Sequence, residues 1–269
     1  MRIRAGYEIV YDCPAPVPMM LMLNVRHERI GDMETPDILK TDPPVPFRQY
    51  RDLFGNLCTR LVAPAGRFTM SADFVVRDSG LPDAITPDAV QHPVDDLPDD
   101  VIHYLLGSRY CETERMVDLA WSLFGDIPPG WARAQAIVAY ANQRVAFGYQ
   151  HARPTKTAFE AHEEGTGVCR DYAHLAITLC RCMNIPARYC TGYMGDIGIP
   201  IEGVMDFSGW FEAYLGGAWH TLDARHTRPR IGRILMARGR DATDTAITTS
   251  FGPNYLAGFK VITEELPEG

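Results

Sequence analysis

The strongest structural signal in the sequence lies in residues 165–186, which read Gly165-Thr-Gly-Val-Cys-Arg-Asp-Tyr-Ala-His-Leu-Ala-Ile-Thr-Leu-Cys-Arg-Cys-Met-Asn-Ile-Pro186. Apolar residues recur every three or four positions over 175–183, which predicts a helix with one buried face. Asn184 and the following proline then end the helix. Counting back along the buried face reaches Cys169, so the sequence predicts a cysteine on the inward face of the first helical turn.

A cysteine at a helix N-terminus has a chemical consequence. The free backbone N–H groups and the positive end of the helix dipole stabilise a thiolate. Gly165 and Gly167 precede Cys169 and leave room for a substrate to approach the backbone. Cys169 is therefore a candidate nucleophile, although a buried free cysteine is more often an inert packing residue. The other six cysteines lack this setting and are expected to pack: Cys13, Cys58, Cys111, Cys180, Cys182 and Cys190.

The composition of the chain excludes several classes of protein. The chain has 269 residues, of which 46% are apolar and 22% charged, as in a globular protein of one or two domains. The net charge of −8 gives no reason to expect a nucleic-acid partner. The seven cysteines, an odd number, indicate reduced thiols, and their spacing is not that of a zinc site, so no metal or other cofactor is expected. The apolar run at 17–23 is too short to span a bilayer, and the charged first residues are unlike a signal peptide; we expect a cytoplasmic protein without a membrane partner.

The first part of the chain has the periodicity of β-structure. Residues 3–11 alternate between apolar and polar side chains, and later apolar runs do the same. The pair Gly55-Asn56 between two apolar runs is typical of a tight hairpin turn. These features predict an N-terminal antiparallel β-sandwich over residues 1–90.

The second part begins after a segment rich in proline and aspartate, residues 79–100, which we interpret as a linker. The apolar period then changes to that of a helix, and amphipathic helices are expected around 116–123 and 131–145. The predicted class is α+β, with the second domain over residues 91–269.

Several motifs of this second part are similar to a known family. The string Gly-x-Gly-Val-Cys-Arg-Asp-Tyr-Ala-His-Leu-Ala at 165–176, the Asn-Ile-Pro segment at 184–193, and the tryptophan-led segments at 210–215 and 219–223 resemble the bacterial transglutaminase-like superfamily, often described as candidate cysteine proteases. The resemblance covers about residues 100–265, and the β-rich N-terminal part also resembles the module that precedes this core in many members. It implies a papain-related thiol fold whose triad is a helix-start cysteine, a strand histidine and an aspartate on the neighbouring strand.

The resemblance makes Cys169 the nucleophile and Asp223 the orienting acid, but Ser208 stands where the family has its histidine. A hairpin at Gly216-Gly217 would pair Ala213 with His220 and turn that imidazole to the face opposite Asp223. His226, beyond the expected end of the strand, is the better replacement. Ser208 itself does not titrate near neutrality and could only hold a water between the cysteine and the aspartate.

Two functions follow. The first is a thiol hydrolase or acyl transferase that acts on peptide or amide bonds of a peptide or protein substrate. Its catalytic residues are Cys169 as nucleophile, Asp223 as orienting acid and Ser208 in the base position, where it could engage a water. The second is a catalytically silent member that binds a peptide or serves as a scaffold.

The backbone N–H of Cys169 is the expected oxyanion donor, and Tyr149 is a weaker second candidate or a core aromatic residue. The arginines at 225–240 either attract a substrate carboxylate or, as we favour, pair with nearby acids. The oligomeric state is left open.

Overall fold

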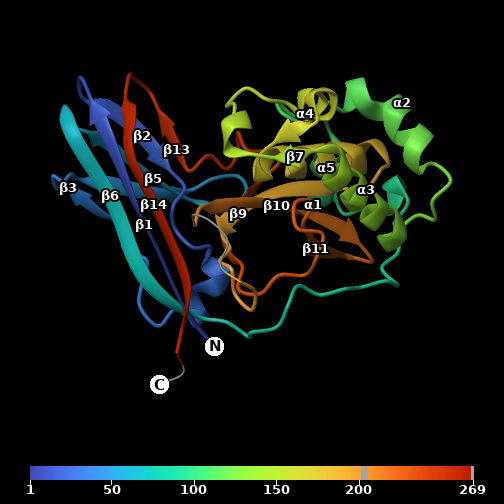
Figure 1. The fold of residues 1–269 in the computed structure, drawn as a ribbon, viewed down its shortest axis with the longest axis horizontal. Coiled ribbons are helices and arrows are strands. Elements are labelled where there is room, and N and C mark those ends of the chain that lie inside the picture. Colours follow the sequence, from blue (N-terminus) through green and yellow to red (C-terminus); the bar gives the residue numbers. More distant parts are fainter. Residues whose placement is uncertain (201–204, 268–269) are drawn as a thin grey trace.

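The computed structural model describes residues 1–200 and 205–267 and has a sheet-rich part beside a mixed helix and sheet part (Figure 1). The predicted α+β class with a sheet-rich N-terminal region is therefore confirmed. The sheet-rich part has two antiparallel four-stranded sheets, in the orders β14-β1-β6-β3 and β13-β2-β5-β4. Its strands are β1 (Arg2–Cys13), β2 (Val17–Leu21), β3 (Lys40–Asp42), β4 (Phe47–Arg51), β5 (Leu57–Ala63), β6 (Gly66–Arg77), β13 (Thr248–Ser250) and β14 (Tyr255–Leu266).

The predicted alternation is visible in β1, where Ile3, Tyr7 and Ile9 are buried in a core that receives side chains from both sheets. The hairpin predicted at Gly55-Asn56 is also present, because β4 and β5 pair directly across that turn. A short helix, η1 (His27–Asp32), interrupts the strands.

Two strands from the end of the chain complete these sheets. β14 pairs with β1 along nearly its whole length, from Leu266 opposite Arg2 to Tyr255 opposite Asp12, and β13 pairs with β2. The range 91–269, predicted as the second domain, therefore includes two strands of the N-terminal sheets. Pairing between strands so far apart in sequence leaves no mark in local periodicity, which explains why the sequence did not indicate it.

The second part is built on the sheet β11-β10-β9-β12, and α5 packs against β10 and β9. The predicted helices are confirmed as α2 (Thr113–Phe124), α3 (Trp131–Arg144) and α5 (Cys169–Cys182). The remaining elements are η2 (Val94–Asp96), α1 (Asp99–Ile102), η3 (His103–Leu105), β7 (Ala146–Phe147), η4 (Tyr149–His151), α4 (Ala158–Glu164), β8 (Thr166–Gly167), β9 (Ala187–Tyr193), β10 (Phe207–Leu215), β11 (Ala218–Leu222) and β12 (Ile234–Gly239). Over the described ranges no helix has the length and apolar character needed to cross a membrane.

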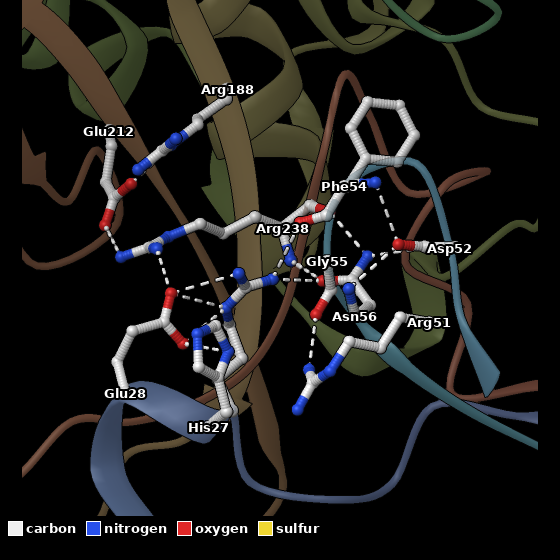
Figure 2. A network of polar contacts seen from close by, with 11 residues as sticks. His27, Glu28, Arg51, Asp52, Phe54, Gly55, Asn56, Arg188, Glu212 and Arg238 are labelled. Carbon is white, nitrogen blue, oxygen red and sulfur yellow. Dashed lines mark hydrogen bonds and ion pairs between the residues drawn. The ribbon is translucent and has the colours of Figure 1, made fainter. Parts of the chain in front are cut away.

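A partly buried polar network joins the two parts (Figure 2). Arg238 on β12 donates to Glu28 at 3.1 Å and, through its other amino group, to Glu212 on β10 at 3.1 Å. Asn56 accepts from the Arg26 guanidinium at 2.6 Å and from the Arg238 backbone N–H at 2.9 Å. Because the hairpin and the loop around Glu28 belong to the N-terminal part, these contacts fix it against the sheet that carries Ser208.

Candidate active site

Cys169 is the first residue of α5, as the sequence predicts. The preceding β8 is held by β7, and the Asp171 carboxylate accepts a hydrogen bond from the Val168 N–H at 2.9 Å, which caps the helix start. Gly167 lies directly against Asp171, where a Cβ would come within 2.7 Å of its side chain. Close packing therefore explains Gly167 better than the predicted room for a substrate does.

Cys169 is half-buried, and its thiol forms no disulfide. Burial raises its pKa, against the lowering effects of the Gly209 and Arg170 backbone N–H groups and of the Arg225 charge, while Asp206 acts to raise it further. The helix start was expected to favour the thiolate, but desolvation of the Cys169 thiol outweighs the groups that lower its pKa. A thiol in this setting needs a base to accept its proton.

Asp223 follows β11 and is the centre of a hydrogen-bonded cluster. Its Oδ1 accepts from the backbone N–H groups of Arg225 at 2.9 Å and His226 at 3.0 Å. Its Oδ2 lies 3.0 Å from Nδ1 of His226 and accepts from Arg233 at 2.8 Å. Burial alone would raise the pKa of Asp223, but the His226 hydrogen bond and the Arg233 charge bring it well below its ordinary value. An ionised Asp223 requires the proton of a neutral imidazole on Nδ1, which leaves the Nε2 lone pair free.

His226 and Ser208 line one cavity of about 190 Å³, and its other charged or hydroxyl-bearing lining residues are Tyr149, Asp196, Asp206 and Arg225. The Arg225 charge lowers the pKa of the Cys169 thiol, and the Asp206 charge raises it. The thiol in turn raises the pKa of Tyr149. Three residues that line the cavity therefore interact electrostatically with the thiol, although Cys169 itself is not part of the lining. Within the described ranges no hydrogen bond joins the thiol to an imidazole.

The structure does not join Ser208 to Asp223. The Ser208 side chain is buried on β10, and its Oγ has no hydrogen-bond partner among the residues that the structure describes. Asp223 instead binds the turn that follows its strand, where Thr227 donates its backbone N–H to the Asp223 carbonyl at 3.0 Å. The turn brings His226 to the carboxylate, which strand alternation alone does not predict.

The other two histidines near the site have supporting roles. The predicted register is confirmed, with Ala213 opposite His220. His220 contacts Thr86 Oγ1 at 3.0 Å and the Leu215 carbonyl at 2.9 Å, so both ring nitrogens are engaged away from Asp223. His174, on α5, is fully buried and accepts the Ala242 N–H at 3.1 Å.

The structure adds Gly209 to the residues that the sequence indicated. Its backbone N–H lowers the pKa of the Cys169 thiol. A Cβ at this position would collide with the Tyr189 hydroxyl. A glycine within a strand is a sign of close backbone approach and could have singled out this position. Tyr149 lines the cavity, and its ring is about half exposed at 53%, so it is not a core aromatic residue. Across the described ranges, no three His, Cys, Asp or Glu side chains are grouped so as to hold a metal ion.

The chain thus combines a helix that begins at a cysteine and packs on an antiparallel sheet with an Asp–His pair after the last residue of β11. Residues 119–224 match the transglutaminase-like superfamily. A candidate cysteine protease from Cytophaga hutchinsonii is 30% identical in sequence with a TM-score of 0.84, over 100% of this chain and 92% of that chain. An uncharacterized protein from Mycobacterium leprae is 35% identical over 95 residues, which is 34% of this chain and 33%, about a third, of that relative. The chain therefore belongs to the transglutaminase-like superfamily, a family of thiol enzymes.

Proposed function

We propose that the protein is a thiol enzyme that hydrolyses peptide or amide bonds or transfers their acyl groups, with Cys169 as nucleophile and His226 as general base. The observation that carries the proposal is the 3.0 Å contact between His226 Nδ1 and Asp223, at a cavity that His226 lines. In this arrangement Asp223 orients the imidazole and Ser208 forms part of the cavity wall. His226 thus takes over the role of the strand histidine that Ser208 replaces.

The reaction begins when His226 Nε2 accepts the thiol proton and the sulfur attacks the substrate carbonyl carbon. The backbone N–H at the helix start stabilises the oxyanion, as amides aimed at developing charge do. The imidazolium then gives its proton to the leaving amine, and a thioester to Cys169 remains. Water completes hydrolysis and a second amine completes acyl transfer, with His226 again accepting the proton.

The raised pKa of the Cys169 thiol makes the base essential. At neutral pH little thiolate forms without a partner, whereas a positioned base contributes about 10²–10⁴-fold in rate. Since all seven cysteines are free, we also place the reaction in a reducing compartment, the cytoplasm.

The test uses a set of fluorogenic peptide amides and a thiol-directed probe with an amide-like recognition group. Cys169→Ala should abolish labelling and turnover, and His226→Gln should lower turnover by about 10²-fold or more. His220→Gln is the matched control, because both of its ring nitrogens are engaged elsewhere. Full turnover in His226→Gln would contradict the assignment of the base. A folded wild-type protein that neither turns over nor reacts would favour the catalytically silent alternative.

A further inference from the structure

The arginines between 225 and 240 mostly pair with acids, as the sequence analysis favoured. Ion pairs of 2.8–3.1 Å join Arg230 to Asp196, Arg233 to Asp83 and Asp223, Arg238 to Glu28 and Glu212, and Arg240 to Asp244. Arg228 is exposed and lines a different cavity. These ion pairs give four of the arginines a structural role.

Arg225 differs from these four, because its guanidinium forms no ion pair with an acidic side chain in the parts of the chain that are described. It is held instead over the ring of Phe147, 3.7 Å from the ring centroid. Its backbone is fixed as well, since its N–H donates to Asp223 and its carbonyl accepts from Asn142 at 2.7 Å. Stacking on an aromatic face orients a guanidinium without neutralising its charge. Arg225 therefore presents a fixed positive charge to the cavity that His226 also lines.

We propose that Arg225 binds a carboxylate of the substrate, so that the enzyme prefers amides that carry an acidic group close to the scissile bond. The inference rests on the proposed function, because it places this group beside Cys169 and His226. A guanidinium can hold a carboxylate through two parallel hydrogen bonds, which a substrate without the anion cannot form. The carboxylate comes either from an Asp or Glu side chain or from the C-terminus of the peptide.

Asp206 limits what the cavity can accept. It lines the same cavity, and no ion pair between it and Arg225 is present in the described parts of the chain. Asp196 also lines this space of about 190 Å³, but its carboxylate is paired with Arg230 at 3.0 Å, so Arg225 and Asp206 are the basic and acidic groups that we expect a ligand to meet. Such a cavity suits a single small carboxylate, bound by Arg225, and disfavours a second anion. The Asp206 carboxylate repels a bound carboxylate, so Asp206→Asn should strengthen the preference that Arg225 creates.

The experiment compares three peptide amides with the same scissile bond. One is neutral with an amidated end, one has an adjacent Glu with an amidated end, and one is neutral with a free C-terminal carboxylate. The wild-type kcat/KM should be about 10- to 100-fold higher for a carboxylate substrate than for the neutral one, as expected for a charge-assisted pair. The substrate that gains identifies the source of the carboxylate.

Arg225→Gln should remove this ratio, whatever happens to the absolute rates, and Arg225→Lys should restore part of it. Arg228→Gln is the control and should keep the wild-type ratio. Turnover of the neutral peptide with no gain for either carboxylate would overturn the role of Arg225 and leave the proposed function intact. If no peptide is turned over, calorimetric binding of the three peptides to Cys169→Ala, with and without Arg225→Gln, provides the same ratio. Equal affinities there would also overturn the inference.

Discussion

The substitution Asp223→Asn probes the centre of the candidate site with little change in shape. The native carboxylate accepts four hydrogen bonds of 2.8–3.0 Å, two from backbone N–H groups and two from the side chains of His226 and Arg233. A carboxamide can keep the two backbone bonds with its oxygen. Its NH₂ group then faces two donors, the imidazole N–H and the Arg233 guanidinium.

The first consequence is for turnover. To accept from the new NH₂ group, His226 must lose its proton from Nδ1 and carry it on Nε2, which removes the lone pair needed to accept the thiol proton. We expect kcat/KM to fall by about 10²–10⁴-fold, the usual worth of a positioned base. The variant should still bind substrate, because the cavity lining is unchanged.

The second consequence is for stability. Removing one partner of a buried ion pair costs about 3–5 kcal/mol, and we expect the lower end, since Arg233 keeps Asp83 at 2.9 Å. The pKa of Asp223 is well below its ordinary value in the folded protein, so its ionised form contributes stability above the unfolded value of about 3.9. That contribution is lost as the pH falls toward the folded pKa.

Urea unfolding of the wild type and of Asp223→Asn at pH 7 and at pH 3 measures these effects. The difference in unfolding free energy should be largest at pH 7 and smaller at pH 3. Turnover of a peptide amide at pH 7 gives the catalytic effect. A variant that retains turnover within about threefold would refute the role of Asp223 in orienting the base, whatever its stability.

Three further predictions use the same assays. Ser208→Ala should keep kcat/KM within about threefold, since the Ser208 Oγ has no partner among the described residues; a large loss would assign the hydroxyl a catalytic role. Gly209→Ala should lower the unfolding free energy by about 1–3 kcal/mol because its Cβ meets the Tyr189 hydroxyl, and adding Tyr189→Phe should recover part of the loss. Arg238→Gln should cost about 1–3 kcal/mol in urea unfolding, because it breaks a partly buried network that includes the buried Glu212. The exposed Arg67→Gln should cost less than about 1 kcal/mol. Equal losses would contradict the assigned difference in burial.

Local pattern was sufficient to predict the elements that position the nucleophile. The helix at Cys169 and the register that turns His220 away from Asp223 both follow from periods of 3.6 and two residues, and both are present. The contact between Asp223 and His226 does not follow from a period. It depends on a turn in which Thr227 has a positive φ of 54°, and this conformation has no clear signal in the residue types alone.

Tertiary packing explains the remaining differences. The helix start favours the thiolate, but the structure partly buries the thiol, and Gly209, whose backbone N–H affects its pKa, lies on a strand about 40 residues away in sequence. The pairing of β14 with β1 joins the two ends of the described chain and is equally non-local. Both depend on contacts that form only when the two parts of the chain pack together.

In the proposed site the imidazole of His226 comes from a turn and not from the strand position that Ser208 occupies, and this turn must hold the imidazole in place. A strand histidine is held by the ladder of its sheet, whereas His226 is held by Asp223, whose second oxygen is shared with Arg233. Arg233 is in turn bound by Asp83, a residue of the linker between the N-terminal strands and the helices. The orientation of the candidate base therefore depends on a chain of buried charges that reaches the linker. We infer that the linker positions the site as well as connecting the two parts, because Asp83 holds the arginine that keeps Asp223 ionised.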